Sequence, residues 1–291
     1  MARPAAPAGR PPAIDYVGSA LLIVLTVVLT LLVDQRSADA LGVGRKGFMA
    51  AALVATLGGF VLQERRAVSP VVNLALFKIR MFLFSALSLL AVAITQSVLS
   101  FLLPFYIQDV LHHSASFMGL LFLSAPVLTI GLAPVSGQLT DRIGPRIPAS
   151  IGLGATMLGF AVGTLLRIDS HWILPTLFLI FTGVGQGFFN TSNQTAIIGS
   201  VPREYRGFAT GIVQMLFGLG SLLGISLAGV LLTVLFRYYS GVPDATPSAS
   251  LPGPFVAAMR ATYALALVVL ALALIASLLR GGRRIEAAAS E

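Results

Sequence analysis

Long uncharged apolar runs alternate with short polar segments along this chain. An α-helix needs about 20 apolar residues to cross the hydrocarbon core of a bilayer. All such runs are expected to be helical, because lipid cannot satisfy exposed backbone groups. The pattern predicts about eight transmembrane helices, at approximately Tyr16–Val33, Gly47–Leu62, Met81–Gln108, Ser114–Thr140, Ile147–Leu166, Trp172–Val201, Gly207–Phe236 and Phe255–Leu279.

The polar segments divide the chain into five regions. Residues 1–15 are rich in Pro and Ala and are expected to form a disordered lead. A pair of membrane helices follows within 16–62. The segment 63–80 is amphipathic and is expected to lie along the membrane surface as a linker. Residues 81–280 would form a six-helix bundle, and 281–291 a polar tail.

Composition places the chain in the membrane class. Hydrophobic residues make up 56% of the sequence and charged residues only 10%, whereas a soluble domain carries about 25% charged residues. Such a chain cannot cover itself with polar surface in water. The fold class predicted is therefore an all-α, polytopic membrane protein. There is no cysteine, which excludes disulfides and thiolate chemistry.

The net charge of +8 fits a membrane orientation better than a nucleic-acid partner. No basic run exceeds two residues, so no nucleic-acid binding is predicted. With both termini cytoplasmic, most Lys and Arg residues fall on the inner side, as the positive-inside rule requires. These are Arg3, Arg10, Arg65, Arg66, Lys78, Arg80, Arg142, Arg146, Arg203, Arg206, Arg280, Arg283 and Arg284. We therefore expect a multi-pass protein of the plasma (inner) membrane.

Side chains suited to catalysis are few. The three histidines, His112, His113 and His171, all fall in outer loops without a second ligand at metal-binding spacing. No nucleophile–base pair and no paired carboxylates can be proposed. The sequence predicts no enzyme, no metal site and no cofactor.

Glycine pairs four residues apart mark candidate helix contacts. Small residues at this spacing let helix backbones approach closely in lipid. Static packing would explain most such pairs, whereas the many glycines of the sixth and seventh helices would also suit helices that slide or bend. The pairs are Gly159 and Gly163, Gly207 and Gly211, and Gly220 and Gly224.

Uncharged polar residues inside the predicted spans are candidates for a substrate pathway. Four of them lie at helical spacing in the sixth span, largely on one face. Two readings stay open: hydrogen bonds between helices, or the polar wall of a pathway. The candidates are Gln186, Asn190, Asn193 and Gln194, with Gln96 and Gln214 on the third and seventh helices.

The segment GQLTDRIGPR, residues 137–146, is a charged island between two uncharged runs. It resembles the G-x-L-x-D-R-x-G-x-R loop of the Major Facilitator Superfamily. The matching positions are Gly137, Leu139, Asp141, Arg142, Gly144 and Arg146. VPREYRGFATG (201–211) resembles a later cytoplasmic loop of that family. VVNLALFKIRMF (71–82) resembles the cytoplasmic segment that precedes the carboxyl-terminal half in the family's 14-helix drug:proton antiporters. Asn73 stands where an acidic residue is common in that segment.

The resemblance implies a half-transporter. Residues 81–280 would be the carboxyl-terminal six-helix bundle, and 16–62 the two helices inserted between bundles. The amino-terminal bundle, with its embedded acidic residue, has no counterpart here. The implied activity is efflux of hydrophobic or amphipathic, drug-like small molecules by alternating access, proton-coupled in the complete transporter. Partners would be an amino-terminal half or a second copy. The alternative is a truncated or accessory protein that does not itself transport.

The resemblance also implies that the island is a conformational gate. Gly137 would allow close helix approach, and Gly144 a tight turn. Asp141 would accept hydrogen bonds from the start of a neighbouring helix, and Arg142 or Arg146 would pair with it or with lipid phosphates. The simpler alternative is a plain positively charged turn.

Overall fold

The structure is a computed structural model, and it describes residues 74–242, 245–248 and 250–280, with positions 24, 51, 52, 55, 56, 58 and 59. The chain divides into two units, Met1–Phe77 and Lys78–Glu291. The lead 1–15 and the tail 281–291 lie outside the described residues. The two predicted spans within 16–62 and the linker before residue 74 lie largely or wholly outside them as well. Leu74–Lys78 forms a short 3-10 helix.

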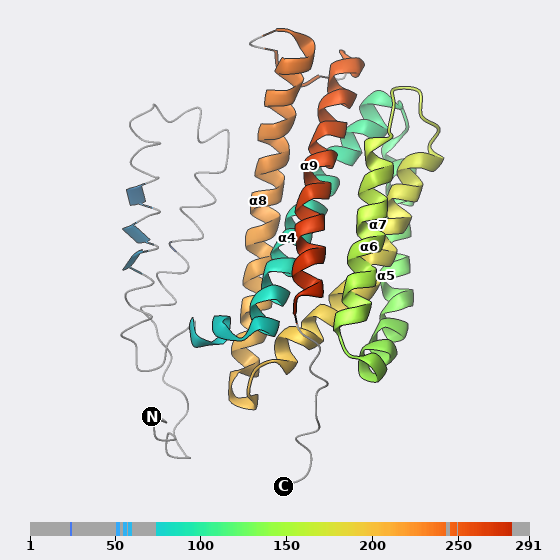
Figure 1. The fold of residues 1–291 in the computed structure, drawn as a ribbon. Coiled ribbons are helices and arrows are strands. Elements are labelled where there is room, and N and C mark those ends of the chain that lie inside the picture. Colours follow the sequence, from blue (N-terminus) through green and yellow to red (C-terminus); the bar gives the residue numbers. More distant parts are fainter. Residues whose placement is uncertain are drawn as a thin grey trace. The chain divides into compact units, whose positions relative to one another are not determined.

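Six long α-helices occupy the described part of the second unit (Figure 1). Each is long and apolar enough to cross a membrane. Their ends fall within a few residues of the predicted spans, because the length of an uncharged run decides how far a membrane helix extends. They are α4 Arg80–Phe105, α5 Ala115–Ile143, α6 Arg146–Thr164, α7 Ile173–Gly199, α8 Arg206–Ser240 and α9 Pro252–Leu278. The all-helical, multi-pass fold predicted from composition is confirmed.

Local signals set where these helices start and stop. The Ser114 hydroxyl accepts a hydrogen bond from the backbone nitrogen of Phe117 and caps the start of α5. Gly241, with a φ of 69°, ends α8 in the left-handed conformation that glycine adopts easily. Pro104 cannot donate a backbone hydrogen bond, and after it α4 continues as a π-helical turn, Tyr106–Val110.

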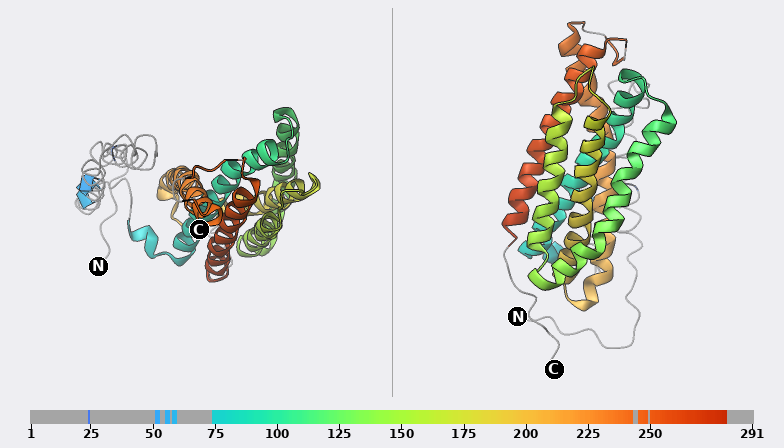
Figure 2. Two further views of the ribbon diagram at one scale, coloured as in Figure 1. Left: turned by 90° about the horizontal axis from the view of Figure 1, so that it is seen from above. Right: turned by 90° about the vertical axis from the view of Figure 1, so that its right-hand side faces the viewer.

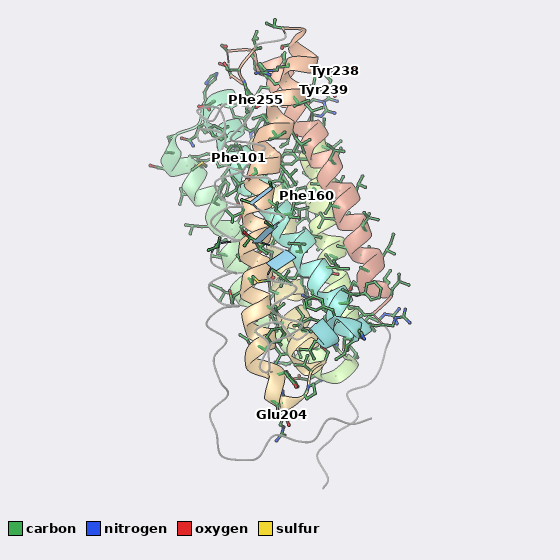
Figure 3. All side chains as sticks on the ribbon, turned by 90° about the vertical axis from the view of Figure 1, so that its left-hand side faces the viewer. Phe101, Phe160, Glu204, Tyr238, Tyr239 and Phe255 are labelled. Atoms are coloured by element: carbon green, nitrogen blue, oxygen red, sulfur yellow. The ribbon has the colours of Figure 1, made fainter. Side chains whose placement is uncertain are left out.

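The six helices pack as two connected groups (Figures 1 and 2). One group has α7 between α5 and α6, and the other joins α4 to α8 and α9; contacts of α6 with α9 and of α4 with α7 hold them together. Successive helices run in opposite directions. We call the end where α4, α6 and α8 begin the Gly144 end, and the other the His112 end. In Figure 3, Glu204 marks the Gly144 end and Tyr238 and Tyr239 the His112 end.

The backbones of α6 and α7 meet without intervening side chains. A methyl group built on Gly152 would lie 2.6 Å from both the carbonyl oxygen of Gly185 and the backbone nitrogen of Phe189. Two turns further along, a methyl group on Gly159 would lie 2.9 Å from Cγ2 of Thr182. Gly163 meets the Phe178 ring in the same way. A larger residue at Gly152 would force the two backbones apart, whereas at Gly163 the Phe178 ring would have to move.

The glycines of α8 differ in whether another helix packs against them. Gly220 and Gly224 lie against α4, where an added methyl group would collide with Ala93 and with the backbone of Ile94. By contrast, a methyl group on Gly207 or Gly211 would meet nothing within 4 Å, and both positions are exposed. No described helix covers that part of α8, so the packing role expected for Gly207 and Gly211 stays a prediction.

An aromatic cluster joins α6, α7 and α9 in the core. The rings of Phe160, Phe178 and Tyr263 are fully buried and make edge-to-face contacts with centroids 5.0 to 5.8 Å apart. Nearer the His112 end, Nε of Arg260 donates a hydrogen bond to the carbonyl oxygen of Thr164, at 2.6 Å. A cation is favourable at this last turn of α6 because helix dipoles end there in partial negative charge.

Substitution of two glycines on α6 tests the backbone contact. We expect Gly152→Ala to lower the unfolding free energy by about 1–3 kcal/mol through overpacking against α7. Gly154→Ala on the same helix meets nothing within 4 Å, so helix propensity alone should act there and raise stability by about 0.5–1 kcal/mol. Denaturant or thermal unfolding of the purified full chain in detergent, followed by helical circular dichroism, measures both. Equal effects at the two positions would contradict the assigned contact.

Candidate functional site

Three polar side chains of α7 form an accessible row. Gln186 and Asn190 are half-buried and Gln194 is exposed. Their spacing of four residues stacks them on one side of the helix. Nδ2 of Asn190 lies 3.5 Å from Oε1 of Gln186, a long hydrogen bond that orders the two amides. This row offers hydrogen-bond donors and acceptors without a formal charge.

An open groove of about 520 Å³ follows the same side of α7 toward the Gly144 end. All of its lining comes from α7, so no second helix of the described chain closes it. The lining contains no ionisable group: it consists of Asn190, Thr191, Gln194, Thr195, Ile198 and Gly199. The groove can therefore contact an apolar molecule and hydrogen-bond its polar groups, but it offers no counter-charge. Thr191 and Thr195 were not predicted, because a threonine in a membrane helix usually bonds its own backbone, as Thr195 does with Thr191.

Asn193 belongs to the interior and not to this row. Its side chain is 0% exposed, and Nδ2 donates a hydrogen bond of 3.2 Å to the carbonyl oxygen of Ser85 on α4. Its Oδ1 is buried and has no hydrogen-bond partner within the described chain. Of the two readings of the polar stripe, the bond between helices therefore describes Asn193, because one residue along a helix turns a side chain by about 100°.

Gln96 and Gln214 lie apart from the groove. Gln96 on α4 is half-buried, and its Oε1 is buried without a hydrogen-bond partner among the described residues. Gln214 on α8 is exposed. Neither residue lines the α7 groove. Of the six predicted polar residues, only Asn190 and Gln194 line the groove. The six therefore do not form a single site within the described chain.

Serine and threonine hydroxyls join α5 to α7 beside the island. The hydroxyl of Ser192 lies 3.1 Å from that of Ser136 and 2.7 Å from that of Thr140. Ser136 also donates to the carbonyl oxygen of Phe188 at 2.9 Å. All three hydroxyl side chains are buried. The sequence signal was weak, since Ser136 and Thr140 share only an i, i+4 spacing, and their partner lies more than fifty residues away.

The island is a tight turn at the end of the bundle. Only Gly144 and Pro145 separate α5 from α6, and Gly144 has a φ of 82°, which glycine adopts without strain. A methyl group on Gly137 would lie 3.9 Å from Cγ2 of Thr191, an ordinary contact distance. The expected close approach is therefore not tight at Gly137. Leu139 is half-buried on α5.

The charged side chains of the island do not interact with the other residues that the structure describes. Asp141 and Arg142 are exposed and Arg146 is half-buried. Within the described ranges, none of the three side chains makes a hydrogen bond or an ion pair. The clasp predicted for Asp141 is thus open here, and its function as a gate stays a prediction.

The histidines lie at the His112 end, as the sequence indicated. The His113 ring is 4.5 Å from that of Phe117, and the Trp172 ring is 6.0 Å from Phe117 and 5.3 Å from His171. Across the part of the chain that the structure describes, no three His, Asp or Glu side chains gather as metal ligands. These aromatic contacts tie the start of α5 to the loop before α7.

These features define a multi-pass membrane protein with an uncharged, open groove on one central helix. Residues 81–290 match the family model described as Major Facilitator Superfamily. The chain belongs to this family, and the resemblance carried by the island is confirmed.

Several curated relatives match the same region. A tetracenomycin C resistance and export protein of Streptomyces glaucescens is 33% identical over 216 residues, which are 73% of this chain and 39% of the relative. The riboflavin transporter RibZ of Clostridioides difficile is 25% identical over 72% of this chain and 45% of its own length. The quinolone resistance protein NorB of Staphylococcus aureus is 27% identical over 76% and 48%. The chain spans less than half the length of these relatives.

Replacement of two adjacent α7 residues, Asn193 and Gln194, tests which of their polar side chains holds the helices together and which lies on the surface. We expect Asn193→Ala to lower the unfolding free energy by about 0.6–1.7 kcal/mol, the range for a hydrogen bond between membrane helices. Gln194→Ala removes a similar amide from an exposed position and should change stability by less than about 0.5 kcal/mol. Unfolding of the full chain in detergent gives both values. A larger loss at Gln194 would refute the assignment of the two side chains.

Proposed function

We propose that this chain forms the carboxyl-terminal half of an efflux transporter for hydrophobic or amphipathic, drug-like small molecules. It would work by alternating access from the plasma (inner) membrane, with both termini cytoplasmic. The Gly144 end is then the cytoplasmic end. The observation that carries the proposal is the open, uncharged groove lined by Asn190, Gln194 and their α7 neighbours.

The chemistry of the groove supports an apolar substrate with a few polar groups. Amide and hydroxyl side chains can donate or accept hydrogen bonds at several angles, while Ile198 offers apolar contact. A charged substrate would find no counter-charge in this wall. An open groove also supports alternating access, since transporter sites lie between two bundles that rock against each other.

The names of the relatives support the same substrate class. One relative is named for resistance to tetracenomycin C and its export, and another is named for resistance to quinolones. Riboflavin, a nutrient, is named in the third. We propose export of a drug-like compound here, because two of these three names concern resistance.

The proposal also includes a proton carrier, a partner and two inserted helices, none of which is part of the described bundle. Among the described spans, carboxylates occur only near the ends, at Asp109, Asp141 and Glu204. A proton carrier would therefore come from a partner, either an amino-terminal half or a second copy of this chain. The 14-helix arrangement, with residues 16–62 as an inserted pair, is part of this proposal.

Dye retention in efflux-deficient cells tests the proposal. The full chain is expressed alone and together with an amino-terminal half encoded upstream, if one is present, and several fluorescent dyes and drugs are measured. We expect lower retention in at least one arrangement. Asn190→Leu should reduce the efflux rate about two- to ten-fold by removing a hydrogen bond to substrate. Thr176→Val, at the opposite end of α7, should have no effect. Unchanged retention in every arrangement would reject transport and favour an accessory, non-transporting protein.

A carboxylate-to-amide change tests the island as a gate. We expect Asp141→Asn to reduce transport without preventing membrane insertion, because the amide keeps the shape of the side chain and loses the charge that a helix start attracts. Glu204→Gln is the matched control, an exposed carboxylate at the same end. Transport and the amount of inserted protein are measured in the same cells. Full transport by Asp141→Asn would favour the plain turn.

A further inference from the structure

Arg280 is a buried cation without a partner. It follows α9 by two residues, and its side chain is only 3% exposed. None of its three guanidinium nitrogens, Nε, Nη1 and Nη2, has a hydrogen-bond partner within the described chain. The other described Arg and Lys side chains at the Gly144 end are exposed or half-buried. Arg280 therefore differs from a surface charge that water satisfies.

The charge of Arg280 persists in spite of burial. Desolvation lowers the pKa of Arg280 to about 10, which still leaves the guanidinium protonated at neutral pH. A buried ion with none of its donors satisfied is strongly unfavourable unless an anion accompanies it. The arrangement is thus incomplete without a negatively charged group.

Two hydrogen bonds place Arg280 level with the starts of α4 and α6. The hydroxyl of Ser277 lies 2.9 Å from that of Ser150, four residues after α6 begins. The Ser88 hydroxyl, eight residues into α4, donates to the carbonyl oxygen of Ala273 at 3.2 Å. Because α9 runs antiparallel to both helices, three further residues bring Arg280 to the first turns of α4 and α6.

Those two helix starts add positive potential around Arg280. Neither the residue before α4, Ile79, nor the residue before α6, Pro145, caps its helix with a side-chain hydrogen bond. Helix starts carry a partial positive charge and favour anions. Lys78, Arg80 and Arg146 lie in the same turns. The described carboxylates at this end, Asp141 and Glu204, are exposed, and neither bonds to Arg280.

We propose that Arg280 binds a phosphate group, supplied by the headgroup of an anionic phospholipid at the Gly144 end. Arg280 lies just beyond Leu278, the last residue of an apolar helix, which is the depth of lipid headgroups. A guanidinium presents parallel N–H donors that match two phosphate oxygens. Basic residues close to the membrane surface attract anionic lipids. This site is separate from the α7 groove and does not depend on the substrate.

Lipid retention by the full chain tests the site. The protein is reconstituted in bilayer discs of phosphatidylcholine with and without phosphatidylglycerol, and bound lipid is counted by native mass spectrometry. We expect selective retention of phosphatidylglycerol. Arg280→Gln should weaken that preference about ten-fold, equivalent to about 1.4 kcal/mol. Arg203→Gln removes the same charge from an exposed position at the same end and should retain the preference.

A second arm distinguishes a headgroup from free phosphate. In lipid-depleted detergent, inorganic phosphate replaces chloride at equal ionic strength, and the melting temperature is measured. If phosphate raises the melting temperature of the unmodified chain and does not raise that of Arg280→Gln, the phosphate site is open to water. Stabilisation by phosphatidylglycerol alone would identify the headgroup.

The proposal is overturned if the unmodified chain prefers neither phosphatidylglycerol nor phosphate, a result that would favour a protein carboxylate as the partner of Arg280. It is equally overturned if Arg280→Gln binds like the unmodified chain. Should Arg280→Gln fail to fold, Arg280→Lys keeps the charge without the two-pronged donor. That variant should retain part of the preference, and an undiminished preference would contradict binding through the guanidinium fork.

Discussion

The contact of α6 with α7 at Gly152 and Gly185 is the constraint on which the arrangement of the site depends. Apolar side chains gain little by leaving lipid for another helix, so close packing must hold membrane helices together. Here two backbones touch because neither glycine has a side chain. The contact fixes one face of α7 against α6, and the Ser136–Ser192–Thr140 hydroxyls fix another against α5. The side of α7 that remains forms the groove.

Polar residues on α7 have two different roles as a result. Those that turn inward, Ser192 and Asn193, are buried and bond to neighbouring helices. Those that turn outward, Asn190 and Gln194, stay accessible and line the groove. Because helix positions advance by about 100° per residue, neighbours in the sequence divide between structure and surface. A change at an inward residue would thus alter the site by moving the helix.

Charge is confined to the two ends of the bundle, where water and headgroups can solvate it. The island shows one solution, since Asp141 and Arg142 are exposed. Arg260 shows a second, with a hydrogen bond to the last turn of α6. Arg280 follows neither pattern, because it is buried and lacks a partner among the described residues. The buried charge of Arg280 and the open groove on α7 are two features whose binding partners are not found among the described residues.

The amino-acid sequence by itself determined the membrane class, the six described spans and the family. These follow from one-dimensional features: the length of uncharged runs and the spacing of residues in the island at 137–146. Tertiary structure alone decided which way a side chain faces. It buried Asn193 beside an exposed Gln194, left Gly207 and Gly211 uncovered, and enclosed Arg280. The physical reason is that burial depends on which helices lie alongside, and residues distant in sequence, such as Ser85, Ser136 and Ser150, decide that.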